Sequence, residues 1–262
     1  DDKAITFISE NGFREIKNWR DLNINVKKVS SFLRKLNIKS KDRVVAYMPN
    51  ISETVEAFLG TVDIGSIWSS CSPDFGINGV IERFSQIKPK VLFVTKEYFY
   101  NGKKINILER LPEILKKIPT IKHVVISSYP GQAEIKKLPK YKNIKTYYWK
   151  NIIKQKNTKL TFTKFDFEHE LAILYSSGTT GKPKCICHKT GGVLLQHLKE
   201  HQLHCDIKEN DNVFYFTTCG WMMWNWLISV LASKASIVLF DGSPMYKKQD
   251  LLLKIANKEK IT

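Results

Sequence analysis

The feature that most constrains this chain is a repeated alternation of short apolar runs with longer amphipathic ones. Residues 43–48 are almost wholly apolar after the first position and are followed by Pro49, so we expect a buried strand there. The next segment, 53–64, has apolar side chains at helical spacing, namely Val55, Phe58, Leu59 and Val62. A short buried strand followed by an amphipathic helix is the unit from which α/β domains are built.

The same alternation continues along the 262 residues. We expect further strands at 66–70, 90–94, 123–126, 171–175, 213–217 and 237–240, and further helices at 80–87, 106–117 and 192–204. This order predicts an α/β fold with largely parallel sheets covered by helices on both faces. The Lys-rich stretch 131–158 interrupts the pattern, and we expect a surface excursion there. The most apolar stretch, 221–240, contains polar residues throughout and predicts a buried element instead of a membrane span.

Residues 176–184 read Ser-Ser-Gly-Thr-Thr-Gly-Lys-Pro-Lys and directly follow the expected strand 171–175. Glycines let a backbone turn sharply and approach a ligand, and successive amide and hydroxyl groups can surround phosphate oxygens. Only two residues separate Gly178 from Gly181, so the segment is not a Walker A loop. A flexible surface loop explains the glycines but not the hydroxyls behind a buried strand. The segment therefore predicts a phosphate-binding loop of another kind.

Residues 175–184 resemble the signature loop of the adenylate-forming superfamily, which includes acyl-CoA synthetases, luciferases and peptide-synthetase adenylation domains. That loop usually ends Pro-Lys-Gly, whereas Cys185 follows Pro183-Lys184 here. This departure is similar to one branch of the superfamily, the acetoacetyl-CoA synthetases. Further segments that resemble this branch are 68–76, 83–91, 195–201 and 216–226. The resemblance covers nearly the whole chain and is weakest in the Lys-rich connector.

The resemblance implies that residues 1–262 form an incomplete N-terminal domain of the adenylate-forming fold. It also implies a two-step ligase reaction that uses ATP, Mg²⁺ and coenzyme A. The carboxylate of acetoacetate attacks the α-phosphate of ATP to give acetoacetyl-AMP and pyrophosphate, and the coenzyme A thiolate then displaces AMP. Donors aimed at the departing pyrophosphate would offset its negative charge. The residues implied to bind the ATP phosphates are Ser176, Ser177, Gly178, Thr179, Thr180, Gly181 and Lys184.

The resemblance also implies an acyl pocket and a contact to coenzyme A. Related enzymes line their acyl pocket where this chain has Trp221, Met222 and Met223, whereas Trp224 and Trp226 are expected to fill the core. Aromatic and Met side chains near helical spacing usually only fill a core, and the resemblance is what favours a pocket. The phosphate on the coenzyme A ribose would meet the basic turn 100–104, with Lys103 as the contact.

The net charge of +17 raises the alternative of a nucleic-acid-binding module. Only six of the 42 basic residues are Arg, and the Lys residues are spread along the chain. Nucleic-acid surfaces usually use Arg for bidentate contacts, so this composition indicates solvated surfaces and no nucleic-acid partner.

The five cysteines are unevenly spaced, which is untypical of a secreted disulfide framework. We therefore expect a reducing compartment, the cytosol. A structural zinc site has to be considered because His197, His201 and His204 are expected on one helical face near Cys205. The Cys-x-Cys-His spacing at 185–188 is not a usual zinc motif, so we expect no bound metal.

The chain begins at Asp1 and not at a Met, and Thr262 falls inside a Lys-rich amphipathic stretch, so we expect a fragment. The resemblance implies that this fragment is inactive alone. By the resemblance, the catalytic Lys and the small C-terminal domain that carries it are expected beyond Thr262. Two further alternatives remain open: a synthetase for another short or medium acyl chain, and a non-catalytic truncated binding protein. The sequence does not predict the oligomeric state.

Overall fold

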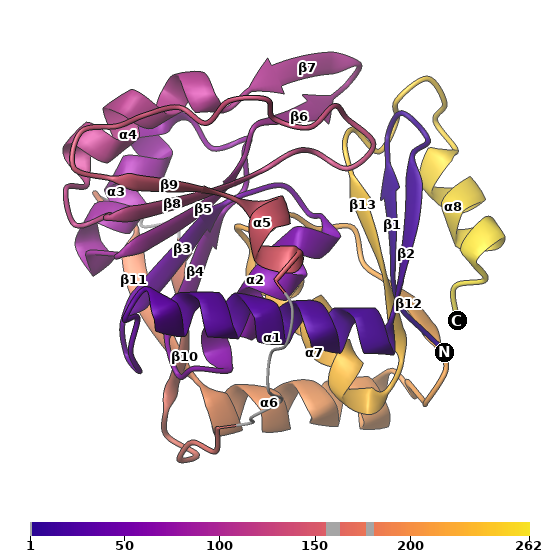
Figure 1. Ribbon diagram of the computed structural model, residues 1–262. Helices are drawn as coiled ribbons and strands as arrows, with labels where there is room; N and C mark the ends of the chain where they lie inside the picture. Colours follow the sequence, from indigo (N-terminus) through magenta and orange to yellow (C-terminus); the bar gives the residue numbers. More distant parts are fainter. Residues whose placement is uncertain (1, 156–162, 177–180) are drawn as a thin grey trace.

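The computed structural model describes residues 2–155, 163–176 and 181–262. In these ranges two main β-sheets lie side by side, with helices between and around them (Figure 1). The strands of the larger sheet are β3 (Arg43–Tyr47), β4 (Ile67–Cys71), β5 (Val91–Thr95), β8 (His123–Ser127), β9 (Lys145–Tyr148), β10 (Glu170–Ser176) and β11 (Lys184–Lys189). Those of the smaller sheet are β1 (Lys3–Ser9), β2 (Arg14–Asn18), β12 (Asn212–Phe214) and β13 (Ser236–Asp241).

The larger sheet has the strand order β11-β10-β4-β3-β5-β8-β9 and is parallel except for β11. Its central strands are buried on both faces, which is why β3 and β5 read as continuous apolar runs in the sequence. β11 lies at one edge and pairs antiparallel with β10. The expected α/β fold with largely parallel sheets is confirmed.

The smaller sheet has the order β12-β13-β1-β2 and joins distant parts of the chain. β1 pairs parallel with β13, so that Ile5 lies opposite Ile237 and Ser9 opposite Asp241. β2 returns antiparallel beside β1. A separate hairpin of β6 (Glu97–Tyr100) and β7 (Lys103–Asn106) follows β5.

The helices cover the sheets and fill the space between them (Figure 1). They are α1 (Trp19–Lys35), α2 (Ser52–Val62), α3 (Ile77–Ile87), α4 (Leu111–Lys117), α5 (Trp149–Ile153), α6 (Thr190–Lys199), α7 (Met222–Ser229) and α8 (Leu251–Glu259), with 3₁₀ turns η1 (Leu108–Arg110) and η3 (Val230–Ser233) and a π turn η2 (Glu200–His204). α8 packs Ile255 against the outer face of the smaller sheet at Ile8 and Val238.

Local chemistry explains why α1 begins and how it packs. The side chain of Asn18 accepts a hydrogen bond from the backbone N–H of Asp21 at 2.7 Å, which caps the first turn. α1 crosses α2 where Gly60 faces Val29, and a Cβ on Gly60 would lie 2.6 Å from the Val29 side chain. The close approach lets Ser30 donate to the Gly60 carbonyl at 3.1 Å.

The core between the two sheets is built around large aromatic side chains. The rings of Trp68 on β4 and Trp224 on α7 stack at 6.5 Å, and Phe58 of α2 meets both edge-on. Trp224 is fully buried, and Trp226 packs against the core partly exposed. In the described ranges, every helix is too short or too polar to cross a membrane.

The structure departs from the expected surface excursion at 131–158. Residues 145–148 form the edge strand β9, and α5 buries Trp149 and Ile152 in the core. The expectation of an excursion was wrong there because a Lys-rich composition concealed a run of aromatic side chains. Residues 156–158 lie outside the described ranges.

Two segments that were each predicted as one α-helix combine an α-helix with a turn of another helix type. The segment predicted as one helix over 106–117 begins with the 3₁₀ turn η1, and α4 starts only at Leu111, where Pro112 takes a first-turn position. The helix predicted over 192–204 starts at Thr190 and ends in the π turn η2.

Candidate active site at the carboxyl edge of the sheets

The carboxyl ends of the parallel strands in both sheets meet at one edge of the molecule. Asn50 directly follows β3, and its backbone N–H donates to the carboxylate of Asp241, the last residue of β13, at 3.1 Å. Ligands of α/β proteins bind in the crevice outside the carboxyl ends of parallel strands. The loops at this edge therefore form the candidate site.

A buried polar network, which we call the inter-sheet junction, consists of Glu10, Asn50, Tyr129 and Asp241. The side chain of Asn50 donates to the carbonyl oxygens of Thr217 and Phe240, each at 3.3 Å. Its amide oxygen also accepts from the indole N–H of Trp224 at 2.9 Å, a pattern that fixes the direction of the amide. The Tyr129 hydroxyl donates to Asp241 at 2.9 Å. These bonds tie the ends of β3 and β13 to the core.

Burial dominates the electrostatics of the junction. Desolvation raises the pKa of Asp241 to about 7, although the bonds from Tyr129 and from the Asn50 N–H act in the opposite direction. Burial also raises the pKa of the Tyr129 hydroxyl. The junction is thus a rigid hydrogen-bonded frame behind the site.

The phosphate hairpin, by which we mean β10 and β11, carries the described part of the predicted phosphate loop. Ser176 ends β10 and lies directly opposite Lys184, which begins β11. Gly181 has φ +97°, a conformation that favours glycine over other residues. The remaining predicted loop residues, Ser177, Gly178, Thr179 and Thr180, lie outside the described ranges. The hairpin thus places Ser176 and Lys184 opposite one another at the two ends of the loop.

The predicted acyl-pocket residues lie on the neighbouring segment at the start of α7. Trp221 and Met222 are exposed, at 59% and 46% of their surface, and Met223 is half-buried. The loop before them is fixed because Ser70 on β4 donates to the Cys219 carbonyl at 2.6 Å. Exposed apolar side chains on an anchored loop suit contact with a short carbon chain.

Two aromatic rings and one guanidinium connect this segment to the phosphate hairpin. A Cβ on Gly220 would lie 2.7 Å from the ring of Phe75. The guanidinium of Arg83 lies over that same ring at 4.4 Å and 5.7 Å from the ring of Tyr175 on β10. Tyr175, next to the predicted phosphate loop, and Gly220, next to the predicted acyl-pocket residues, are therefore linked through Phe75 and Arg83. The motif 83–91 contains Arg83, but its role could not be assigned from sequence.

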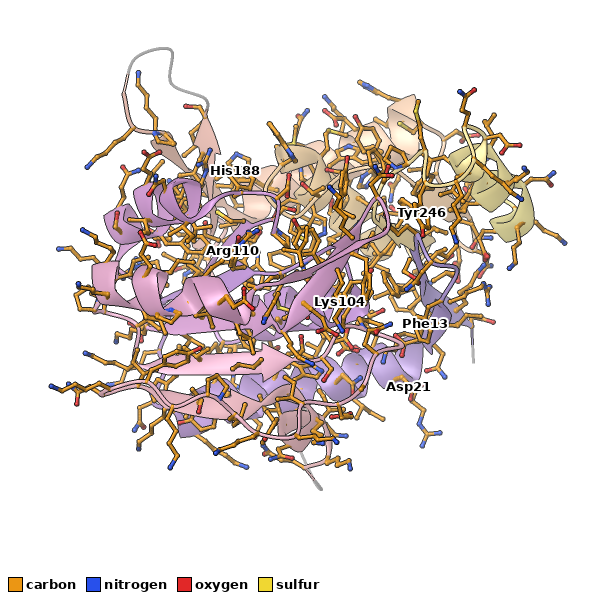
Figure 2. The ribbon with its side chains drawn as sticks, turned by 90° about the horizontal axis from the view of Figure 1, so that it is seen from above. Phe13, Asp21, Lys104, Arg110, His188 and Tyr246 are labelled. Atoms are coloured by element: carbon orange, nitrogen blue, oxygen red, sulfur yellow. The ribbon has the colours of Figure 1, made fainter. Side chains whose placement is uncertain are left out.

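The loop 73–75 is held by Arg110, which sequence reasoning did not identify. Its guanidinium donates to the Pro73 carbonyl at 2.8 Å and to the hydroxyl of Tyr47. Burial raises the pKa of Tyr47 to about 12, so its hydroxyl stays protonated and donates to the Phe75 carbonyl at 2.7 Å. Figure 2 shows the molecule from above, with Arg110 labelled as well as Lys104 and Tyr246 from other segments.

The predicted coenzyme A turn is the tip of the β6–β7 hairpin. Its backbone N–H groups at Asn101 and Gly102 both donate to the carboxylate of Glu10 at 2.8 Å. The same carboxylate accepts from the N–H of Ser243 at 2.7 Å. Lys103 is exposed, whereas Lys104 forms an ion pair with Glu97 at 2.9 Å. Glu10 thus fixes the turn, and Lys103 extends from it.

Thr262, beyond which the catalytic Lys is expected, lies at the amino end of β12. Its backbone N–H donates to the Asn212 carbonyl at 3.1 Å, and its hydroxyl accepts from the Asn212 N–H at 3.2 Å. Because β12 runs parallel to β13, this amino end points away from the carboxyl edge where the candidate site lies. The catalytic Lys beyond Thr262 stays a prediction, since it would not belong to this stretch of chain.

The expected histidine face does not form as predicted. Cys205 donates its backbone N–H to the Glu200 carbonyl at 2.9 Å, the bond of a π turn, and this wider turn leaves His204 exposed while His197 and His201 are buried. Among residues 2–155, 163–176 and 181–262, no three His, Cys, Asp or Glu side chains gather closely enough to hold a metal ion. All five cysteines are free thiols.

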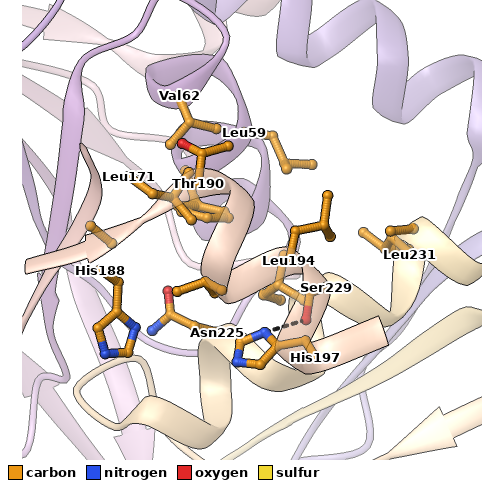
Figure 3. Close-up of a pocket in the computed structure, with 15 residues that line it drawn as sticks. Leu59, Val62, Leu171, His188, Thr190, Leu194, His197, Asn225, Ser229 and Leu231 are labelled. Carbon is orange, nitrogen blue, oxygen red and sulfur yellow. Dashed lines mark hydrogen bonds between the residues drawn. The ribbon is translucent and has the colours of Figure 1, made fainter. Parts of the chain in front are cut away.

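An apolar pocket of about 200 Å³ lies beside these histidines, between α2, β10, α6 and α7 (Figure 3). His188, His197 and Asn225 lie on one side of it and Leu231 on another. His197 is bonded through Nδ1 to Ser229 Oγ at 2.8 Å, and burial lowers its pKa to about 4. The ring is therefore neutral at ordinary pH and behaves as part of the pocket wall.

The geometry agrees with comparisons to known proteins. The chain belongs to the AMP-binding enzyme family, whose model matches residues 1–262. It is 44% identical to an acetoacetyl-CoA synthetase of Gallus gallus, over 100% of this chain and 40% of the relative. It is also 41% identical to a malonamoyl-CoA synthetase of Penicillium aethiopicum, over 94% of this chain and 35% of the relative.

A solved structure gives the same result. The fold superposes on an acetoacetyl-CoA synthetase from Streptomyces lividans with a TM-score of 0.92 and 36% identity, over 100% of this chain and 39% of that one. The resemblance stated from the sequence is confirmed. The chain spans about 40% of the length of the first of these curated relatives.

Proposed function

We propose that the protein carrying this chain is an AMP-forming acetoacetate–CoA ligase. The observation that carries the proposal is the pairing of Ser176 with Lys184 at the carboxyl edge of the sheet, beside an anchored apolar loop. The similarity to acetoacetyl-CoA synthetases over the whole chain supports the choice of substrate.

In the first step, the carboxylate oxygen of acetoacetate attacks the α-phosphate of ATP, and pyrophosphate leaves. The difficulty is electrostatic, because a carboxylate must approach a polyanion. Ser176, Gly181 and Lys184 would hold the β- and γ-phosphates, together with Ser177, Gly178, Thr179 and Thr180. Donors held in place before the reaction stabilise the charge that develops on the leaving group.

Mg²⁺ would accompany the nucleotide. Within the described part of the phosphate hairpin the loop end offers the Ser176 hydroxyl and no carboxylate, since Glu170 lies at the far end of β10. This donor set fits an ion that is bound chiefly by phosphate oxygens and water, as Mg²⁺ usually is in nucleotide sites. Bound there, Mg²⁺ would supply additional positive charge on the phosphates.

The acyl group would rest against Trp221, Met222 and Met223. The Trp221 ring offers a flat apolar wall, and the thioethers adapt to a small chain. In the second step the coenzyme A thiolate attacks the acyl carbon of acetoacetyl-AMP, and AMP leaves. Lys103 would bind the ribose phosphate of coenzyme A, because its ammonium is exposed on a turn that Glu10 holds in place.

The proposal also places this chain within a longer protein. Residues 1–262 would be part of an N-terminal domain, with the small C-terminal domain and its catalytic Lys beyond Thr262. The chain alone would not complete the reaction. The five free thiols and the relatives' activity support a cytosolic location.

The test is acetoacetate-dependent exchange of labelled pyrophosphate into ATP by the full-length protein, with acetate and butyrate as comparison acids. We expect exchange to be greatest with acetoacetate and to fall about a hundredfold in Lys184→Ala. The matched control is Lys189→Ala, at the other end of the same exposed strand, with exchange unchanged. Equal exchange with all three acids would defeat the substrate assignment, and an active Lys184→Ala would defeat the role of the loop.

A second candidate substrate is malonamate, favoured by the Penicillium relative. Malonamate differs from acetoacetate only in carrying an amino group in place of the methyl group. An apolar wall of Trp221 and Met side chains suits the methyl group, whereas an amide would need a hydrogen-bond acceptor. Exchange that is faster with malonamate than with acetoacetate would reverse the order of the two candidates.

A further inference from the structure

We propose that Arg83 and Gln86 on α3 form a brace that positions the phosphate hairpin for ATP. The inference rests on the proposed function, because it takes the hairpin as the phosphate site. It assigns a positioning role to two residues outside the loop itself. Arg83 contacts Tyr175 before the loop, and Gln86 contacts Pro183 at the end of the loop.

Gln86 holds the side where the chain leaves the loop. Its amide nitrogen donates to the Pro183 carbonyl at 2.9 Å and to the Glu82 carbonyl of its own helix at 2.8 Å. Pro183 lies between Lys182 and Lys184, and proline has no N–H to donate. A bond to its carbonyl therefore fixes the backbone between the two lysines.

Arg83 holds the side where the chain enters the loop. Its guanidinium lies over the ring of Phe75 and also over that of Tyr175, and it donates to the Gly79 carbonyl at 2.9 Å. Tyr175 directly precedes Ser176 on β10. The planar guanidinium can stack on both rings, which the ammonium of Lys would not reproduce.

The hairpin needs this support because β11 is an edge strand. β11 pairs only with β10 among the described strands, and its residues are exposed except for the half-buried His188. α3 is fixed to the core by the fully buried side chains of Val80 and Phe84. Residues 79, 83 and 86 are spaced to share one face of the helix. The brace therefore transfers the rigidity of the core to the two ends of the loop.

The test uses the full-length protein with Gln86→Met, which keeps the length of the side chain and removes the donor. We expect the KM for ATP to rise about fivefold to tenfold, because the hydrogen bond from Gln86 to the Pro183 carbonyl is lost. Thioester formation from supplied acetoacetyl-AMP and coenzyme A should not change, because that step does not use the β- and γ-phosphates. Gln86→Lys restores a donor and should recover most of the ATP affinity.

Ser85→Ala is the matched control, because Ser85 is an exposed neighbour on the same helix. If Gln86→Met behaves like Ser85→Ala, or slows both half-reactions equally, the brace is wrong. ATP binding measured by calorimetry separates this outcome from failure of the proposed function. An unmodified protein that binds ATP but shows no acetoacetate-dependent exchange would overturn the ligase assignment alone.

Discussion

The inter-sheet junction and the phosphate hairpin lie at the same edge of the molecule but are built in opposite ways. In the junction, Asn50 and Tyr129 are 1% exposed, and their side-chain hydrogen bonds end on groups deep in the core. In the hairpin, β11 is exposed and held by one neighbouring strand. Removing a partner from a buried network costs far more than removing one from an exposed edge.

This difference separates two tasks. The junction fixes the strand ends from which the site loops start, and it leaves no donor free for a ligand to compete for. The hairpin leaves Lys182 and Lys184 exposed, so their hydrogen-bonding capacity is available to an anion. Variants in the junction should therefore change folding, and variants in the hairpin should change ATP chemistry.

The largest effect should come from Asn50→Ala. The substitution leaves the indole N–H of Trp224 and two carbonyl oxygens unpaired in the core. We expect the free energy of unfolding to fall by about 3 kcal/mol. Urea unfolding followed by tryptophan fluorescence measures it, with the exposed Asn23→Ala as control. A loss no greater than in the control would show that the junction is not a frame.

A smaller effect should come from Glu56 on α2, the helix that follows Asn50 in the chain. Burial raises its pKa from about 4.5 to about 8, and the nearby ammonium of Lys17 only partly offsets this. Burial also raises the pKa of Glu53 to about 7, and the charge of Glu53 raises the pKa of Glu56 further. Between about pH 4.5 and pH 8, the folded chain therefore keeps a proton on Glu56 that the unfolded chain has already released.

The contribution of Glu56 to stability is thus full below pH 4.5 and is lost as the pH rises through about 8. We expect the free energy of unfolding to be about 2 kcal/mol lower at pH 9 than at pH 6. Glu56→Gln should flatten this dependence, and the exposed Glu113→Gln should not. An equal slope in both variants would place the titrating group elsewhere.

Glu10→Gln should have a smaller effect again. The amide keeps one oxygen, but its NH₂ group would face a backbone N–H of Gly102, Asn101 or Ser243. We expect a loss of about 1.5 kcal/mol in the free energy of unfolding. The KM for coenzyme A should rise while the KM for ATP does not. A change in both constants would mean that the turn and the hairpin are not separate.

The smallest effect should come from Lys189→Ala at the far end of β11. The ion pair of Lys189 with Glu168 is solvent-exposed, and such pairs contribute little. Thermal unfolding should give a midpoint within error of the unmodified protein. A clear loss of stability would show that the edge strand is held more firmly than its exposure indicates.

The spacing of apolar residues along the sequence predicted most of the larger sheet, because β3, β4, β5 and β8 are buried runs bounded by turns. It did not predict α1, whose apolar residues are interspersed with Asn and Lys, or β9, which lies in the Lys-rich tract. It could not predict the junction, because Glu10 and Asp241 meet only through the pairing of β1 with β13. The roles of Arg83, Gln86 and Arg110 likewise depend on contacts across the fold.

The pairing of β1 with β13 has a consequence for biosynthesis. Ile5 is translated near the beginning of this stretch, but its partner Ile237 is made only near the end of it. At about 5–20 residues per second, translation takes on the order of 10–50 s to cover that distance. During that time β1 has only β2 beside it, and an isolated hairpin is barely stable in water. The nascent chain therefore exposes an apolar strand for many seconds, which makes it a natural client for ribosome-associated chaperones.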